Sequence, residues 1–480
     1  MVHQLTPEQQ ALSLARKKKK EEAAVSQKQD SPPTAYQKLL KNPAAKVFSR
    51  EWLFGCKERN DSTTLVATWN ILAQILVRRE LFVGSDCLKT AQRHPMILAE
   101  ILSHEADIFC LQEVDRQDKL LPAFHEAGYT ETFGCGPGKK HGCMILHREK
   151  RYEKIAERVV FYDQESVRED LADGVNIFGL THRTRNIGLL VALRDKVNKQ
   201  TPPVIVATTH LFWHGLYKYE RARQVGILKR ESIRFRNEHG GSTSSIVMAG
   251  DFNFQPNEVG YALLRRADLT PEHYSELESS RVVHVSLDPT VPRTPRTGTE
   301  ADDDDEAAGA GAAPRPDLKK GGEDEEDEED EEDEPEPVVA TKIKDSRPAI
   351  ETDGLLSNEE MLELFDTGRE ARSAYDEMLG QSAESTGESD NVVSARDSSM
   401  KGRKGANEPM WSCFTHYWRS TLDYIFIVDP PEKGGTLQVL DTLKSARTEV
   451  LGDGLPRLGI SPSDHVALAA LLGRAIGSEV

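Results

Sequence analysis

Cysteine is scarce in this chain, and the few cysteines present do not form a recognisable set. Six cysteines are spread over 480 residues, and no two of them have the spacing of a CxxC pair. This argues against a disulfide framework and against a zinc ribbon. Several cysteines lie in apolar runs, such as Cys110 in DIFCLQ. We therefore expect buried, reduced thiols and a cytoplasmic or nuclear location.

Long hydrophobic runs are also missing. No apolar stretch reaches the roughly 20 residues that a membrane-spanning helix needs. Residues 1–25 contain Glu8 and lack the apolar core of a signal peptide, so we expect neither membrane attachment nor a secretory leader. This region instead contains a short basic cluster, Lys17–Lys20, flanked by glutamates. The cluster is compatible with a nuclear import signal and with a solvated tail.

Negative charge is concentrated in one segment. Residues 300–336 contain 20 acidic and 3 basic residues, whereas the formal net charge of the whole chain is −18. The rest of the chain is nearly neutral, so the overall acidity does not exclude a polyanionic substrate. Because the segment can bury little apolar surface, we expect it to be disordered. Two roles fit it: binding a basic protein partner in competition with nucleic acid, or acting as a solubilising spacer.

Outside this segment, apolar runs alternate with amphipathic stretches. Most runs are apolar on successive residues, which predicts strands buried on both faces, packed in two layers with helices outside. The expected strands start near residues 64, 107, 142, 188, 204, 245, 422, 436 and 465, and the expected helices lie near 92–104, 116–127, 218–237 and 256–267. Ser357, with Glu360 three residues on, predicts the start of a further helix.

These patterns predict one domain with an interruption. The expected parts are an N-terminal polar extension (1–60), a single domain in two parts (61–288 and 350–480), an acidic disordered insertion between them (289–349) and a polar flexible loop (381–407). Polar motifs stand on both sides of the insertion, which favours an insertion into one domain over a linker between two.

Six polar motifs end or follow these runs. They are TWNILAQ with Asn70, LQEVD with Glu113, TTHL with His210, GDFNFQP with Asp251 and Asn253, LDYIF with Asp423, and PSDH with Asp464 and His465. Carboxylate, amide and imidazole groups at strand ends can meet at one rim of a sheet. Such a set can hold Mg²⁺, bind a phosphate and activate water.

GDFNFQP is the most specific of these motifs. Asp251 and Asn253 are two residues apart, so on a strand end both side chains would point to the same face. Gly250 would permit a tight turn. A carboxylate beside a carboxamide can take a proton from water. The common alternative for Asp-x-Asn is an Asx turn, so the decision depends on partners elsewhere in the chain.

The motif PSDH supplies an imidazole. A protonated His465 can bind a phosphate oxygen in the transition state. Asp423 is an acid within an otherwise apolar strand, which makes it the best candidate to orient His465 and to raise its pKa. When each residue is considered alone, a structural role is the commoner interpretation: a helix cap or core position for His465, a strand end for Glu113 and a turn for Asn70. The ordered set favours a site.

Two arginines, Arg221 and Arg223 in KYERARQ, fall on one predicted helix. They could contact the phosphates of a nucleic acid. The favoured interpretation is a solvated helix face.

The motif order resembles that of the endonuclease/exonuclease/phosphatase superfamily of Mg²⁺-dependent phosphodiesterases. Within it, the motifs together resemble the CCR-four-like RNA exonucleases, and LAQ followed by RRELF is most similar to the fungal Ngl branch. The resemblance covers about Leu65–Tyr261 and Leu355–Leu472. One departure is Thr209, where many relatives have Asn before the histidine. The leucine-rich repeats of the deadenylase that gives the group its name are absent.

The resemblance implies a fold and a cofactor. The fold is a four-layer α/β sandwich of two packed mixed β-sheets with outer helices. The cofactor is Mg²⁺ or Mn²⁺, with Glu113 and Asn70 at the metal. Asp464 would hold the adjoining loop or act as a further ligand.

The resemblance also implies catalytic roles. Asp251 and Asn253 would handle the attacking water. His465, oriented by Asp423, would stabilise the phosphate, and His210 would assist it.

The resulting hypothesis is a monomeric, Mg²⁺-dependent 3′→5′ exoribonuclease that releases 5′-mononucleotides from RNA with a free 3′ end. Trimming of ribosomal RNA precursors is favoured over removal of poly(A). One alternative keeps the scaffold and changes the substrate to DNA or a phosphorylated small molecule. Another is a catalytically inactive RNA-binding scaffold, against which the presence of Glu113, Asp251 and His465 argues.

Overall fold

The apolar runs form two six-stranded sheets. The first has the order β15-β16-β1-β2-β4-β3 and the second β11-β14-β8-β7-β6-β5. The structure is a computed structural model that describes residues 37, 39, 41–56, 59–168, 174–293, 342–386, 391–432 and 435–474. The strands of the first sheet are β1 (Thr63–Asn70), β2 (Ile108–Val114), β3 (Tyr129–Gly134), β4 (Gly142–Arg148), β15 (Leu437–Thr442) and β16 (Leu468–Arg474). Those of the second are β5 (Tyr152–Phe161), β6 (Ile187–Asp195), β7 (Val204–Thr209), β8 (Ile246–Asp251), β11 (Ala371–Ser373) and β14 (Asp423–Val428).

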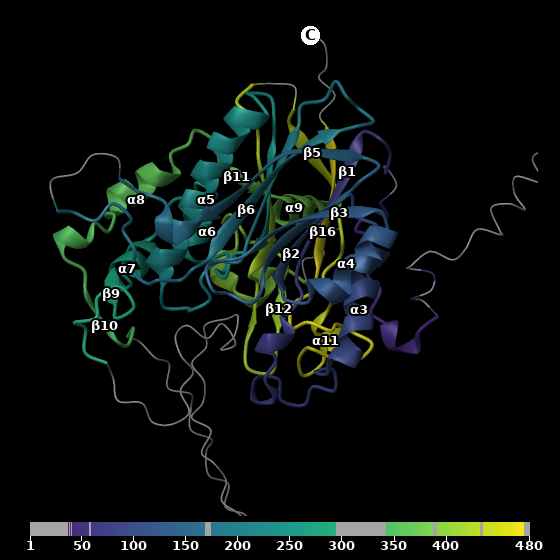
Figure 1. The fold of residues 1–480 in the computed structure, drawn as a ribbon, viewed down its shortest axis with the longest axis horizontal. Helices are drawn as coiled ribbons and strands as arrows, with labels where there is room; N and C mark the ends of the chain where they lie inside the picture. The colour runs from purple at the N-terminus through teal and green to yellow at the C-terminus, as the bar shows by residue number, and fades with distance from the viewer. Residues whose placement is uncertain are drawn as a thin grey trace, which may run out of the picture.

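The sheets pack face to face, with helices on their outer faces. A buried core between the sheets joins Val66 and Ile108 of the first sheet to Leu189, Val247 and Ile425 of the second. Figure 1 shows α5, α6, α7 and α8 beyond the second sheet and α3 and α4 beyond the first. This arrangement confirms the expected four-layer α/β sandwich.

The helices have the following bounds: α3 (Thr90–Ser103), α4 (Gln117–Glu126), α5 (Lys218–His239), α6 (Val259–Leu264), α7 (Pro271–Ser279), α8 (Asn358–Phe365), α9 (Ala374–Thr386), α10 (Val393–Arg396) and α11 (Thr448–Leu451). Four short strands form two ribbons: β9 (Val282–His284) with β10 (Ser346–Pro348), and β12 (Cys413–Phe414) with β13 (Arg419–Ser420). Short 3₁₀ turns occupy Pro43–Ala45, Gln74–Leu76, Arg79–Leu81, Tyr162–Gln164, Glu351–Asp353 and Ser398–Met400. Within the described residues, no helix has the length and apolarity needed to cross a membrane.

Strands from both sides of residues 289–349 enter each sheet. In the first sheet β16 pairs with β1, and in the second β14 pairs with β8. Strand β10, which lies in the range 289–349, pairs with β9, which precedes it. Helix α9 and helix α10 occupy part of the expected flexible loop at 381–407. The acidic residues 300–336 and the cluster Lys17–Lys20 lie outside the described residues.

The start of α8 agrees with the sequence-based expectation, whereas the start of the last strand differs from it. The capping box is confirmed, because the Ser357 hydroxyl accepts from the Glu360 N–H and the Glu360 carboxylate from the Ser357 N–H. Strand β16 begins at Leu468 instead of His465. His465 instead forms an isolated antiparallel bridge with Cys413, and its carbonyl accepts from the Trp69 indole and from the Ser461 hydroxyl.

The short strands β9 to β13 and the longer strands β3 and β5 had no counterpart among the expected strands. Strands β3 and β5 lie at sheet edges, and their buried and exposed positions are mixed. A search for continuous apolar runs finds strands buried on both faces and passes over edge strands of this kind.

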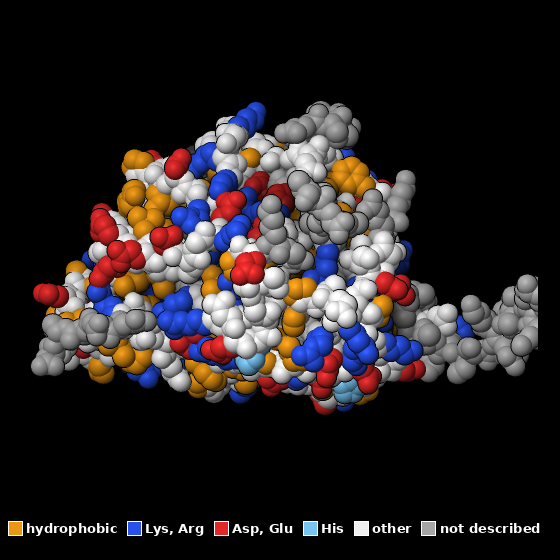
Figure 2. Space-filling view, turned by 90° about the horizontal axis from the view of Figure 1, so that it is seen from above, with side chains coloured by type: hydrophobic (Ala, Val, Ile, Leu, Met, Phe, Trp, Pro, Cys, Tyr) orange, Lys and Arg blue, Asp and Glu red, His pale blue; other side chains and the backbone are white. Residues whose placement is uncertain are grey.

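Figure 2 shows the end of the molecule where β16 finishes. This end is opposite to the one where β16 begins, which follows His465 in the chain. Basic and acidic side chains are interspersed on this face. Such a mixed surface has no strong field of one sign to attract a polyanion.

Candidate active site

The predicted residues come together at one end of the sandwich, named here the rim, where β1, β2 and β8 end and β14 begins. Asn70 ends β1 and Asp251 ends β8, while Asp423 starts β14 directly opposite Asp251. The Asn70 amide donates to the Glu113 carboxylate at 2.8 Å and to the Asp251 carboxylate at 3.0 Å. Asn70 thus links an acid of the first sheet to an acid of the second.

Glu113 reaches this rim through an irregularity in β2. The pairing of β2 with β4 shifts between Leu111 and Val114, and Glu113 has a φ of 59°. A left-handed backbone is costly for a residue with a Cβ, and such positions cluster at functional sites. The second carboxylate oxygen accepts from the Ala73 N–H at 2.8 Å. Burial raises the pKa of Glu113, although His141 nearby lowers it in part.

Asp251 is fully buried, and Gly250 brings it close to its neighbours. A Cβ on Gly250 would lie 2.4 Å from the carbonyl oxygen of Thr209, so glycine serves close strand approach here and not the expected tight turn. His210 then lies beside Asp251, with Nε2 3.6 Å from its carboxylate and Nδ1 3.9 Å from that of Glu113. Burial and the nearby Asp423 raise the pKa of Asp251 to about 8.

Asn253 departs from the expected geometry. Strand β8 ends at Asp251, and Asn253 has a φ of 51°, so the two residues do not share a strand face. The chain forms an Asx-type turn instead, in which the Asn253 N–H donates to Asp251 Oδ1 at 3.0 Å. The Asn253 amide donates to the Leu211 carbonyl at 2.9 Å. Its Oδ1 is buried and has no partner among the described residues.

His465 and Asp423 form a fully buried pair. His465 Nδ1 lies 2.7 Å from Asp423 Oδ2, and both side chains have an exposed fraction of 0%. His465 Nε2 lies 3.7 Å from Asp251 Oδ2, which is too far for a hydrogen bond. Burial opposes the charged imidazole, but Asp423 together with Cys413, Asp464 and Asp251 outweighs it, so the pKa of His465 lies well above its ordinary range.

Asp464 lies in the loop that carries His465. Its carboxylate accepts from the Ser463 hydroxyl at 3.3 Å, and the same hydroxyl donates to the Asn70 carbonyl at 2.7 Å. The Asp464 carbonyl accepts from Phe414 N at 2.8 Å. These bonds tie the loop to the end of β1. Burial raises the pKa of Asp464, which a nearby positive charge would reverse.

The donor set fits a hard divalent cation. Glu113 and Asp251 are buried acids joined through Asn70, and burial raises the pKa of both. A cation beside them would stabilise the charged carboxylates, and oxygen donors suit Mg²⁺ and Mn²⁺.

Two described groups of buried side chains have ligand atoms within 4.8 Å of one another: Asp251, Asp423 and His465, and Cys413, Asp464 and His465. In both groups the imidazole already pairs with Asp423. Sequence patterns had not singled out Cys413, because its contact with the PSDH loop depends on the pairing of distant segments.

A basic cavity beside the rim was not expected from the sequence. It has a volume of about 380 Å³ and is lined by Arg78, Lys139, Lys140, His141, His182, Arg183, Arg185, Phe212 and Trp213, among others. His141 is close enough to lower the pKa of Glu113, which links the cavity to the rim. The clusters GKKH and THRTR were the available signals, but each is a short basic run that occurs on many surfaces.

The favoured interpretation of Arg221 and Arg223 is wrong, and so is the alternative of contacts to nucleic acid. Both side chains are buried. Arg223 pairs with Glu220 at 2.7 Å, and Arg221 pairs with Glu258 at 3.0 Å. Arg221 also donates to the carbonyls of His214 and Gly215, and Arg223 to those of Tyr162 and Phe178, so neighbouring segments cover α5 at these positions.

Comparison with known proteins defines the class. Residues 67–317 match the model of the Endonuclease/Exonuclease/phosphatase family, and the chain belongs to that family. The assignment made from the six motifs is thereby confirmed.

Individual relatives refine this result. The chain is 26% identical over 477 residues to RNA exonuclease NGL2 of Saccharomyces cerevisiae, covering 92% of this chain and 82% of that protein. It is 29% identical to Protein angel homolog 2 of Mus musculus over 45% of this chain and 40% of that protein. The crystal structure of ANGEL2, a 2′,3′-cyclic phosphatase, matches with a TM-score of 0.52 at 19% identity, over 89% of this chain and 98% of that one, which shows a shared fold.

Proposed function

We propose that the protein is a divalent-metal-dependent 3′→5′ exoribonuclease that releases 5′-mononucleotides from RNA with a free 3′ end. The observation that carries the proposal is the meeting of Glu113, Asp251 and His465 at one rim, linked through Asn70 and Asp423. The similarity to RNA exonuclease NGL2 over most of both chains supports RNA as the substrate. We favour trimming of ribosomal RNA precursors over removal of poly(A), as the resemblance of the sequence motifs to the fungal Ngl branch implies.

Asp251 is the proposed general base. Its Oδ2 atom lies 3.7 Å from Nε2 of His465, the proposed phosphate ligand, so it can accept a proton from a water that attacks this phosphate. The Asn253 Oδ1 atom is buried and open, and an acceptor of this kind can orient the water. Mg²⁺ or Mn²⁺ held by Glu113, with Asn70 and Asp251 beside it, would supply positive charge next to the negative charge that develops on the phosphate.

His465 is the proposed phosphate ligand. Asp423 occupies Nδ1 and favours the charged imidazole, which leaves the buried Nε2–H open to donate to a phosphate oxygen. His210 Nε2 lies 3.6 Å from the same Asp251 oxygen that His465 approaches, so His210 can donate to the same phosphate.

The basic cavity supports a nucleic-acid substrate. Arginine and lysine side chains attract phosphates, and the half-buried Trp213 offers a flat ring against which a base can stack. Such a local concentration of basic residues contrasts with the mixed charges on the face shown in Figure 2.

The test uses purified protein and 5′-labelled RNA with an unmodified 3′ end, in Mg²⁺, in Mn²⁺ or in EDTA. We expect a ladder that shortens from the 3′ end with either metal and no reaction in EDTA. RNA with a blocked 3′ end and DNA of the same sequence should react slowly. Activity that survives chelation, or that is equal in Asp251→Ala, would contradict the proposal. Reaction confined to RNA ending in a 2′,3′-cyclic phosphate would reassign the chemistry.

A further inference from the structure

A second cavity opens beside the basic cavity. It has a volume of about 510 Å³, within the range of small-ligand pockets. Arg183 and Arg185 line both cavities, so the two are neighbours across these arginines. Asn186 in its wall donates to the carbonyl of His210 at 2.8 Å. The second cavity therefore borders the basic cavity, and one of its wall residues is hydrogen-bonded to the backbone that carries His210.

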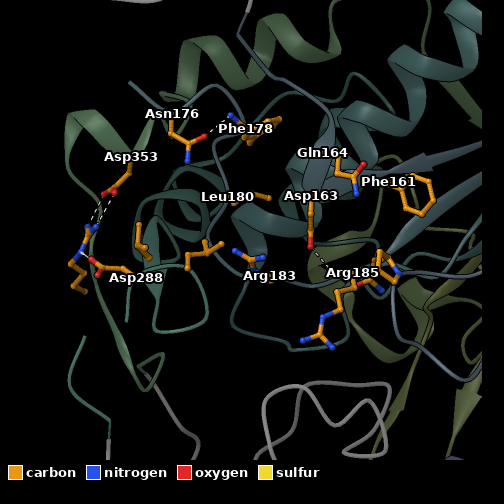
Figure 3. Close-up of a pocket in the computed structure, with 15 residues that line it drawn as sticks. Phe161, Asp163, Gln164, Asn176, Phe178, Leu180, Arg183, Arg185, Asp288 and Asp353 are labelled. Atoms are coloured by element: carbon orange, nitrogen blue, oxygen red, sulfur yellow. Dashed lines mark hydrogen bonds and ion pairs between the residues drawn. The ribbon is translucent and has the colours of Figure 1, made fainter. Parts of the chain in front are cut away.

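The walls of this cavity combine flat apolar groups with amides. Phe161, Phe178 and Leu180 are half-buried, and Gln164 and Asn176 are exposed at its edge. Figure 3 shows Phe178 and Asn176 on one wall, Phe161 and Gln164 on another, and Leu180 between them. An aromatic ring with amide donors and acceptors beside it is suited to a nucleobase, which has a flat apolar face and a polar edge.

The charges in the cavity differ from one side to the other. On the far side, Arg347 is neutralised by Asp288 at 2.8 Å and Asp353 at 2.7 Å. Within the wall, the half-buried Asp163 accepts from the Thr184 hydroxyl and from the Arg185 N–H.

Arg183 is different from these paired groups. Its side chain is exposed, and it has no carboxylate partner in the described part of the chain. A phosphate is therefore favoured near Arg183, at the border with the basic cavity, and disfavoured deeper inside near Asp163. A nucleotide would enter with its base in the cavity and its phosphate at the arginine.

We propose that this cavity, named here the Phe178 pocket, binds the base of an RNA nucleotide on the 5′ side of the cleaved bond, with a phosphate of that chain on Arg183. The inference rests on the proposed function. After cleavage the 3′ nucleotide leaves, so the remaining chain on the 5′ side is what can extend from the rim across the basic cavity. RNA too short to reach the Phe178 pocket would lose this contact, which gives the enzyme a preferred minimum length of single strand.

The first test measures how affinity depends on RNA length. The inactive full-length variant Asp251→Asn is titrated into labelled RNAs of increasing length that share one 3′ end, and binding is followed by fluorescence anisotropy. We expect a step in affinity once the RNA reaches the Phe178 pocket. Phe178→Ala should reduce that step by at least about fivefold, the lower range for loss of one base–aromatic stack. Phe178→Tyr keeps the ring and should restore it. Equal steps in the two variants would overturn the proposal.

A second pair of variants uses exposed positions, where folding is not at risk. Gln164→Glu adds a negative charge at the edge of the pocket, and Gln200→Glu adds the same charge at an exposed position between β6 and β7. We expect Gln164→Glu to weaken binding of the longer RNAs several-fold and Gln200→Glu to change it less than twofold. Equal effects would show that RNA does not pass this cavity and would also overturn the proposal.

Three further outcomes separate the possible explanations. If free 5′-AMP abolishes the length step without displacing the shortest RNA, the mononucleotide and the longer RNA compete for the Phe178 pocket, which supports the proposal. If wild-type protein hydrolyses RNA but no length step exists, the pocket proposal fails and the proposed function stands. If the step exists but wild-type protein hydrolyses no RNA, the proposed function fails while the binding site stands.

Discussion

Two of the fully buried ion pairs among the described residues have different surroundings. Asp423 pairs with His465 at the rim, and Glu220 pairs with Arg223 on α5. Each pair has a closest distance of 2.7 Å, and all four side chains have an exposed fraction of 0%. By distance and burial alone, the two pairs are equivalent.

Their remaining polar atoms distinguish them. One Glu220 oxygen accepts from the Arg223 guanidinium, and the other accepts from the N–H and the hydroxyl of Thr181. Arg223 also donates to the carbonyl of Tyr162. In the rim pair, Asp423 Oδ1 and His465 Nε2 have no partner among the described residues.

This difference suggests how to read buried charges. A closed network of partners stabilises the fold, because every desolvated atom regains a hydrogen bond. An open atom in a buried pair costs free energy unless something else binds it, so open atoms gathered at one rim indicate a site for a ligand.

The largest effect is expected from Asp251→Asn. This substitution removes the carboxylate that faces the open Nε2 of His465, and with it the proposed general base. We expect the rate of RNA hydrolysis to fall by about 10³-fold or more. Single-turnover kinetics measure the effect, and urea unfolding should show that the fold is retained. A loss below about tenfold would contradict the role of Asp251.

Breaking the closed pair should act on stability instead. Glu220→Ala leaves the buried Arg223 without its counter-charge, so we expect a loss of about 3–5 kcal/mol in the free energy of unfolding. The control is Glu153→Ala, which removes one partner of the exposed pair with Arg194 and should cost less than about 1 kcal/mol. Urea titrations of both variants measure the difference. Equal losses would mean that burial does not distinguish the two pairs.

The next effect tests whether the rim pair acts as a unit. Asp423→Asn removes the charge that orients His465 and favours its charged form, so we expect the rate to fall by about 10²-fold. In the double variant with His465→Ala, the loss should not exceed that of His465→Ala alone. Additive losses would show that Asp423 acts independently of His465.

The smallest effect is expected at Glu408, whose hydrogen bonding is intermediate between that of the closed pair and that of the rim pair. Glu408 is buried, and one oxygen accepts from the Tyr261 hydroxyl at 2.8 Å, but the other is open. Burial and the nearby Asp376 raise the pKa of Glu408 to about 8. The unfolded chain releases this proton near pH 4.5, so the free energy of unfolding should fall as the pH rises from about 4.5 to about 8.

Glu408→Gln removes this titration. At pH 8 we expect the variant to be more stable than the wild type by about 1–3 kcal/mol, with little difference below pH 4.5. Urea unfolding across this pH range measures both curves. Parallel curves for the two proteins would show that Glu408 is ionised in the folded state throughout.

Much of the fold was accessible from sequence because its signals are local. Continuous apolar runs predict the central strands, and the Ser357–Glu360 spacing predicts the start of α8, since both depend on residues that are neighbours in the chain. Edge strands β3 and β5 were missed because their patterns are mixed.

For the site, too, the sequence revealed some features and only the structure revealed the others. The types of residue at positions 70, 113, 251, 423 and 465 indicated metal-assisted phosphate chemistry before any geometry was known. The amino-acid sequence by itself determined which chemical groups are available and in what order, because side-chain identity does not depend on folding.

Tertiary structure alone decided which of these groups meet and which polar atoms stay open. The Asn70 bridge, the left-handed backbone of Glu113 and Asn253, and the burial of Arg221 and Arg223 all depend on contacts between distant segments. A charged residue has the same letter in the sequence whether it is solvated, paired in a closed network or open at a rim. Its environment is set by the strands and helices that pack around it, and that environment determines its pKa, its partners and its role.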